Sequence, residues 1–139
     1  MTILIKNGRV LNPSENLDKV MDILVEDGRI KEKKEQIETD ADKIIDAKGC
    51  YVMPGLIDLH VHFRDPGLTY KEDIETGSRA AAHGGFTTVC CMPNTKPVVD
   101  NVDTVKYIIE KGKEVGLTNV LPVGAVTMNM EGKEVTDIE

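Results

Sequence analysis

The sequence lacks three features that would each define a class of protein. No apolar run approaches the ~20 residues that span a membrane, and the first residues, MTILIKNG, are not a basic segment followed by an apolar stretch of signal-peptide length. Basic residues are in the minority, since 17 Lys and Arg stand against 24 Asp and Glu, for a net charge of -7. We therefore expect a soluble, cytoplasmic protein that binds neither membranes nor nucleic acid.

Cysteine is also scarce, at Cys50, Cys90 and Cys91. The number is odd, and the adjacent Cys90 and Cys91 would point to opposite faces of a strand. That arrangement is poor both for a disulfide and for chelating one metal ion. We expect buried, reduced thiols.

The first 53 residues consist of short β-like runs separated by turn signals. The dipeptides Asn7-Gly8 and Asp27-Gly28 each lie between two such runs. Dipeptides of this kind are typical of two-residue hairpin turns, so the pattern predicts two hairpins. Residues 31–38 are highly charged, which favours a solvated edge strand or loop.

After Pro54 the pattern changes to alternating strands and helices. Residues 69–72, TYKE, have the form of a capping box, and glycines follow both predicted helices. Strand starts recur about every 30 residues, which is the βαβ period and implies parallel strands. The expected strands and helices, in chain order, are 56–62, 69–83, 86–92, 102–115 and 120–126.

His60 and His62, at the end of the first of these strands, are the most informative pair. Residues i and i+2 of a strand share a face, so both imidazoles would project together with a spacing that suits one divalent metal. The turn signal Asp65-Pro66-Gly67 ends the strand where the histidines lie. Catalytic groups of parallel α/β proteins lie at such strand ends. The pattern therefore predicts half of a metal site, although H-x-H also occurs in surface strands.

Two further polar residues are predicted at the same edge of the sheet. Arg64 follows the histidines, and Asn94 lies in the loop after the second strand. Each has a structural alternative, because Arg64 can form an ion pair with Asp65 or Asp73, and Asn94 can be a turn residue between prolines.

Two other residues near these strands have open or structural roles. Asp58 shares the face of the histidines, one pleat deeper, and either orients an imidazole or lies at the strand entrance. His83 is better explained as a residue at a helix C-terminus than as a ligand.

These segments together resemble the bacterial dihydroorotases (class I type) of the amidohydrolase superfamily. The resemblance covers essentially the whole chain. The D-x-H-x-H strand is common to the superfamily, whereas the Arg two positions on and the MPNT loop favour dihydroorotase over its relatives. The segments that carry the resemblance are residues 54–67, PGLIDLHVHFRDPG, 69–73, TYKED, 84–89, GGFTTV, and 92–95, MPNT.

The resemblance implies an activity and a cofactor. The reaction would be the reversible hydrolysis of the cyclic amide of (S)-dihydroorotate to N-carbamoyl-L-aspartate, in de novo pyrimidine biosynthesis. His60 and His62 would bind one or two Zn²⁺ ions. The remaining metal ligands and the general base are expected beyond Glu139, so no catalytic residue is assigned here.

The resemblance also implies how the small-molecule substrate is bound. Arg64 and Asn94 would hold its carboxylate. His62, Phe63 and Arg64 together would line the substrate.

The implied fold is a (β/α)8 TIM barrel of the metal-dependent hydrolase type, with a small N-terminal β-sandwich subdomain over residues 1–53. A barrel takes about 250 residues, so residues 54–139 hold only its first three βα units. The last four residues, TDIE, again have capping-box form and predict the start of a helix. We interpret the chain as the N-terminal portion of a longer enzyme, and we expect this portion to be inactive by itself.

Two alternatives to dihydroorotase remain open. A sister cyclic-amide hydrolase, such as a hydantoinase or an allantoinase, fits the superfamily strand but is less favoured by Arg64 and the residues after it. A non-catalytic scaffold for aspartate transcarbamoylase has no need of His60 and His62. A homodimer and a transcarbamoylase partner are both left open by the sequence.

Overall fold

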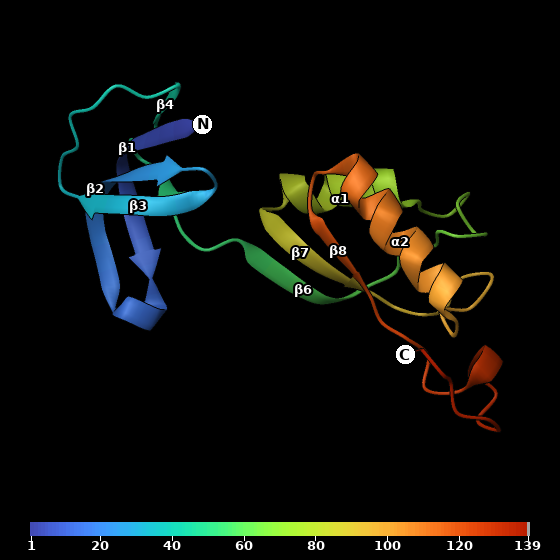
Figure 1. Cartoon of the computed structure of the whole chain (residues 1–139). Coiled ribbons are helices and arrows are strands. Elements are labelled where there is room, and N and C mark those ends of the chain that lie inside the picture. The colour runs from blue at the N-terminus through green and yellow to red at the C-terminus, as the bar shows by residue number, and fades with distance from the viewer. Residues whose placement is uncertain (139) are drawn as a thin grey trace. The chain divides into compact units, whose positions relative to one another are not determined.

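The computed structural model describes residues 1–138, which form two compact units, residues 1–54 and residues 55–138 (Figure 1). The strands of the first unit are β1 Thr2–Asn12, β2 Leu17–Glu26, β3 Arg29–Lys34, β4 Lys43–Asp46 and β5 Tyr51–Val52. The second unit contains β6 Leu56–Val61, α1 Ile74–His83, β7 Phe86–Cys91, α2 Val102–Val115 and β8 Asn119–Pro122. Within the described residues, no helix is both long enough and apolar enough to cross a membrane.

The first unit is one mixed sheet in the order β3-β2-β1-β4, with β5 also paired to β1. β1 is antiparallel to β2 but parallel to both β4 and β5. The expected β-sandwich is not formed by the described residues of this unit. The reason is that β1 is 11 residues long, so that β4 and β5 pair with successive stretches of it instead of forming a second layer.

Asn7-Gly8 is not a hairpin turn, contrary to the sequence prediction. β1 continues through both residues, and its register against β2 shifts between Ile5 and Gly8, which marks a β-bulge. Asn7 has the positive φ of 63° that the turn signal implied, because Asn tolerates the left-handed region. A dipeptide that favours positive φ is compatible with a bulge as well as with a turn.

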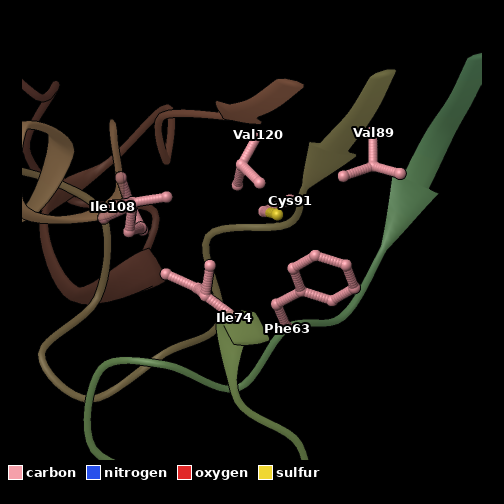
Figure 2. Packing of buried hydrophobic residues seen from close by; sticks show 7 residues of the cluster. Phe63, Ile74, Val89, Cys91, Ile108 and Val120 are labelled. Carbon is pink, nitrogen blue, oxygen red and sulfur yellow. The ribbon is translucent and has the colours of Figure 1, made fainter. Parts of the chain in front are cut away.

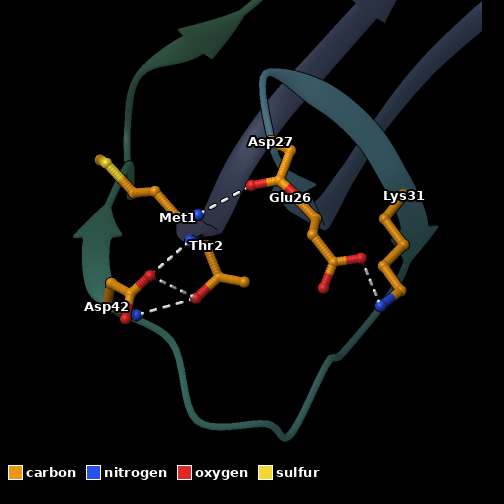
Figure 3. A network of polar contacts seen from close by, with 6 residues as sticks. All are labelled: Met1, Thr2, Glu26, Asp27, Lys31 and Asp42. Carbon is orange, nitrogen blue, oxygen red and sulfur yellow. Dashed lines mark hydrogen bonds and ion pairs between the residues drawn. The ribbon is translucent and has the colours of Figure 1, made fainter.

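The second predicted hairpin is confirmed. Asp27 and Gly28 join β2 to β3 with φ values of 50° and 75°, as a two-residue turn of positive φ requires. The Met1 amino group lies 2.8 Å from a carboxylate oxygen of Asp27, which lowers the pKa of that carboxyl group. Figure 3 shows this contact beside the 2.6 Å hydrogen bond from the Thr2 amide to Asp42. All of these groups are exposed, so we expect the contacts to add little stability.

Asp22 is the buried charge of the first unit, with 2% of its surface exposed. Its carboxylate accepts hydrogen bonds from the backbone amides of Asn7, at 2.9 Å, and Ile37, at 3.0 Å. One side chain therefore satisfies the amide freed by the bulge and holds the segment after β3 against the sheet.

The second unit is a parallel sheet in the order β6-β7-β8 and contains two helices, as predicted. Residues from the strands and from both helices form one hydrophobic core, and Figure 2 shows their side chains converging. β8 ends at Pro122, earlier than expected. The buried members of the core are Phe63, Ile74, Val89, Cys91, Val99, Ile108 and Val120.

Helix α1 begins later than predicted. Its N-cap is Asp73, whose side chain accepts a hydrogen bond from the Thr76 amide at 2.7 Å, so Thr69 does not start the helix. Tyr70 is 78% exposed, whereas Ile74 is completely buried. Residues four apart on a helix share a face, so a helix from Thr69 would have placed these two side chains together. Helix α2 matches the prediction, with Gly116 as its left-handed C-cap at φ 64°.

The cysteines are all free, but only part of the prediction for them holds. Cys91 is buried in the core, and burial raises the pKa of its thiol to about 12. Cys90 is half-buried, and Cys50 is exposed, contrary to expectation, because it ends the turn before β5, where its amide donates to the Ala47 carbonyl at 2.9 Å. The helix start predicted at residues 136–139 includes Glu139, which lies outside the described residues.

We predict that Asp22→Ala lowers the free energy of unfolding by about 2–3 kcal/mol, because the buried amide of Ile37 and the part-buried amide of Asn7 lose a charged acceptor. Asp18→Ala is the matched control. It removes an exposed carboxylate that pairs with Arg9 at 2.6 Å on β1, and should leave stability nearly unchanged. Urea denaturation of the variants, followed by circular dichroism, measures both. Equal stabilities for the two variants would contradict the role given to Asp22.

Candidate functional site

His60 and His62 lie together at the carboxyl end of β6, as the sequence predicted. Their Nε2 atoms are 3.2 Å apart, and the two rings meet edge to face at 71° with centroids 5.0 Å apart. Both side chains are exposed. Two imidazole nitrogens thus converge on one accessible point.

A bulge in β6 accompanies this arrangement. Between Asp58 and Val61 the register of β6 against β7 shifts, so that β6 contains one more residue than its partner over this stretch. The amide of His60 donates to the Asp58 carboxylate at 3.0 Å. Asp58 therefore supports the backbone under the histidine pair. The structure gives it no contact with an imidazole, which was one of its two predicted roles.

Asn94 contacts the histidine pair from the neighbouring strand end. Its Oδ1 lies 2.9 Å from Nδ1 of His62. An amide oxygen only accepts, so this contact requires a proton on Nδ1 of His62, and in the neutral ring the lone pair then lies on Nε2. Such a contact fixes the tautomer and the ring orientation that a metal ligand needs. β6 and β7 are parallel, which is why residues 32 positions apart meet here.

The two Nε2 atoms fit a metal ion. Nitrogen ligands of tetrahedral zinc, each about 2.05 Å from the ion, lie about 3.3 Å from each other, which is close to the 3.2 Å observed here. Across residues 1–138, no three His, Cys, Asp or Glu side chains gather closely enough to hold a metal by themselves. The described residues could therefore supply two ligands of a larger set.

Arg64 follows the histidines and is partly buried. Neither of its predicted ion-pair partners contacts it among the described residues. Asp73 caps α1, and Asp65 accepts a 2.8 Å hydrogen bond from the Tyr107 hydroxyl. Within residues 1–138 the guanidinium thus has no ion-pair partner, so its five donors remain available to a ligand.

Phe63, which the sequence predicts to line the substrate together with its neighbours, has its side chain in the core, and its contact with substrate stays a prediction. Its side chain is 6% exposed and belongs to the core, where it packs on Gly77 of α1. Any side chain at position 77 would overlap the Phe63 ring. Because neighbours along an extended chain point to opposite sides, Phe63 turns inward while the histidines face outward. His83 lies exposed in the last turn of α1, as expected for a residue at a helix C-terminus.

Sequence reasoning missed how the two loops of the site are joined. The Lys96 amide, in the β7–α2 loop (residues 92–101), donates to the Pro66 carbonyl, in the β6–α1 loop (residues 62–73), at 3.0 Å. Gly67 has a φ of 88°, and a Cβ there would overlap the Lys96 carbonyl. The D-P-G turn signal was the available clue, but it indicated only a turn and not a close approach between loops.

The fold of the chain is shared by solved structures of hydantoinases. L-hydantoinase (dihydropyrimidinase) from Arthrobacter aurescens has a similar structure, with a TM-score of 0.75 and 32% identity over 90% of this chain and 28% of that one. A structure of D-hydantoinase matches with a TM-score of 0.63.

A narrower assignment follows from sequence comparison. A family model described as Dihydro-orotase-like matches residues 49–139, and the chain belongs to this family. Dihydroorotase from Aquifex aeolicus is 56% identical over 137 residues, which are 99% of this chain and 32% of that protein. Dihydroorotase from Pelobacter propionicus is 52% identical, over 99% of this chain and 33% of its own. The chain thus spans about a third of the length of these curated relatives.

We predict that Phe63→Ala lowers the free energy of unfolding by about 3–5 kcal/mol, because it leaves a cavity in the core. Tyr70→Ala, an exposed aromatic of the same loop, is the control and should change stability little. Denaturant titration measures both. A stability of Phe63→Ala equal to that of the parent would indicate that the ring is not a core residue.

Proposed function

We propose that the chain is part of a dihydroorotase, a cyclic amidohydrolase that opens the ring of (S)-dihydroorotate to N-carbamoyl-L-aspartate and closes it in biosynthesis. The observation that carries the proposal is the convergence of His60 and His62 beside an Arg64 that has no ion-pair partner within the described residues. Family membership supports the same reaction class. We further propose that residues 1–53 form a β subdomain, and that residues 54–139 supply the first three βα units of a (β/α)8 barrel.

In this proposal His60 and His62 hold zinc through their Nε2 atoms. When bound, zinc would supply an activated water near neutral pH and would polarise the carbonyl of the cyclic amide. Asn94 keeps the His62 ring in the orientation and tautomer that leave Nε2 free, through its 2.9 Å contact at Nδ1. We place the remaining ligands and the general base outside this chain.

Arg64 and Asn94 would recognise the carboxylate that distinguishes dihydroorotate from an uncharged cyclic amide. The guanidinium can form two parallel, charge-assisted hydrogen bonds with a carboxylate. The Oδ1 atom of Asn94 accepts the hydrogen bond from His62. Its amide NH₂ group has no partner among the described residues and can donate to the substrate carboxylate. One asparagine would thus connect the metal ligand to the substrate.

A hydantoinase is the second candidate. The structural similarity to L-hydantoinase favours it, since the two chains share a fold at 32% identity. Arg64 separates the two activities, because a ring without a carboxylate offers a guanidinium no charged, bidentate partner. A panel of dihydroorotate, hydantoin and dihydrouracil, tested with the enzyme that contains this chain, would distinguish the two activities.

We expect His60→Ala or His62→Ala to abolish dihydroorotase turnover and to lower the zinc content of the enzyme that contains this chain, because each removes a ligand. His83→Ala removes an exposed histidine from the end of α1 and is the matched control. Zinc per chain is measured by plasma emission spectroscopy, and turnover by ring hydrolysis. Full zinc occupancy with a normal rate in either ligand variant would refute the metal assignment.

Arg64→Lys should reduce kcat/KM for dihydroorotate roughly 10- to 100-fold with zinc retained. The positive charge remains, but the two parallel N–H donors of the planar guanidinium are lost. Asn94→Ala should have a weaker effect on kcat/KM and should also weaken zinc binding about 10-fold or more, through His62. Arg79→Lys, on the exposed face of α1, is the control. Parental kinetics in both site variants would leave Arg64 as a surface cation and favour the hydantoinase alternative.

A further inference from the structure

Asp65 is a buried carboxylate that the proposed function does not use. It is 5% exposed, and no Lys or Arg of the described residues pairs with it. A buried charge without a cation is costly unless hydrogen bonds replace its water shell. The burial of Asp65 therefore has to be compensated by hydrogen bonds to its carboxylate.

Both known partners of Asp65 come from helices. Its Oδ1 accepts a 2.8 Å hydrogen bond from the hydroxyl of Tyr107, in the second turn of α2. Its Oδ2 lies 3.5 Å from the backbone nitrogen of Ile74, the first residue of α1. A carboxylate at a helix N-terminus is also favoured by the helix dipole. The loop that begins after β6 is thus attached to both helices through one side chain.

Three other contacts leave this loop little freedom on either side of Asp65. The Phe63 ring is fixed in the core, the Leu68 amide donates to the Arg64 carbonyl at 2.8 Å, and Pro66 accepts from Lys96 of the neighbouring loop at 3.0 Å. Arg64 is therefore the one residue between two buried anchors, Phe63 and Asp65, and it is the residue proposed to bind the substrate.

We propose that Asp65 and Tyr107 are positioning residues for Arg64. Their hydrogen bond fixes the backbone of Arg64, so that its guanidinium is already in position when a carboxylate binds. Neither residue touches the substrate. This inference rests on the proposed function, because it assigns Arg64 to the substrate carboxylate.

Tyr107→Phe removes the hydroxyl and keeps the ring, and Tyr70→Phe is the matched control, on an exposed tyrosine with no hydrogen bond among the described residues. In the enzyme that contains this chain, we expect Tyr107→Phe to lower kcat/KM for dihydroorotate roughly 10-fold, mostly through KM, with zinc content unchanged. Tyr70→Phe should match the parent.

A double-mutant cycle distinguishes positioning from general stability. If Tyr107 acts through Arg64, Tyr107→Phe should have almost no further effect on kcat/KM in an Arg64→Lys background. A loss of thermal stability with unchanged KM, or full additivity with Arg64→Lys, would overturn the proposal and leave the hydrogen bond a structural one.

Amide hydrogen exchange separates a failure of this inference from a failure of the proposed function, because it needs no substrate. Tyr107→Phe should speed the exchange of the Leu68 amide, which donates to Arg64, at least about 10-fold relative to Tyr70→Phe. Unchanged exchange would refute the positioning role whatever the activity. Faster exchange in an enzyme that does not turn over dihydroorotate would instead refute the proposed function and retain the loop contact.

Discussion

The candidate site depends on the burial of Phe63. This ring lies in the core of the second unit against Gly77, and it stands directly between His62 and Arg64 in the chain. Because its position is set by packing, the residues on either side of it are set as well, and alternation along the chain turns them outward. A hydrophobic contact that takes no part in chemistry thus determines where the polar groups lie.

The parallel arrangement of β6 and β7 supplies the other half of the site. Carboxyl ends of parallel strands meet at one edge of a sheet, which brings Asn94 to 2.9 Å from His62. Parallel sheets need both faces covered, and here the helices that follow the strands contribute the core residues Ile74 and Ile108. The same elements that build the core therefore place the ligands, so stability and site geometry are coupled in this unit.

Charge is arranged differently in the two units. In the first, most acidic side chains are exposed, and the buried Asp22 serves the backbone of a bulge. In the second, the buried Asp65 takes neutral donors from two helices, which leaves the neighbouring Arg64 without a competing partner among the described residues. An ion pair between Arg64 and Asp65 would have occupied the guanidinium donors that a carboxylate ligand needs.

Local pattern alone was sufficient for the βαβ order, for helix α2 and its Gly116 cap, and for the convergence of His60 and His62. These follow from periodicity and from residue spacing, which act over a few residues. The start of α1 and the bulge at Asn7 were mispredicted, because Asp73 and Thr69 are both acceptable caps, and positive φ suits bulges as well as turns. In each case a contact distant in sequence, Ile74 in the core or Asp22 under the bulge, selected among locally equivalent conformations.

The sequence by itself determined which residue types could do chemistry and on which strand ends they lie. Only the tertiary structure decided that Phe63 belongs to the core, that Asn94 contacts the metal-ligand candidate His62, and that Asp65 pairs with Tyr107 instead of Arg64. These are choices between partners up to 42 residues apart in the chain. Periodicity contains no information about them, because they depend on how the strands and helices pack.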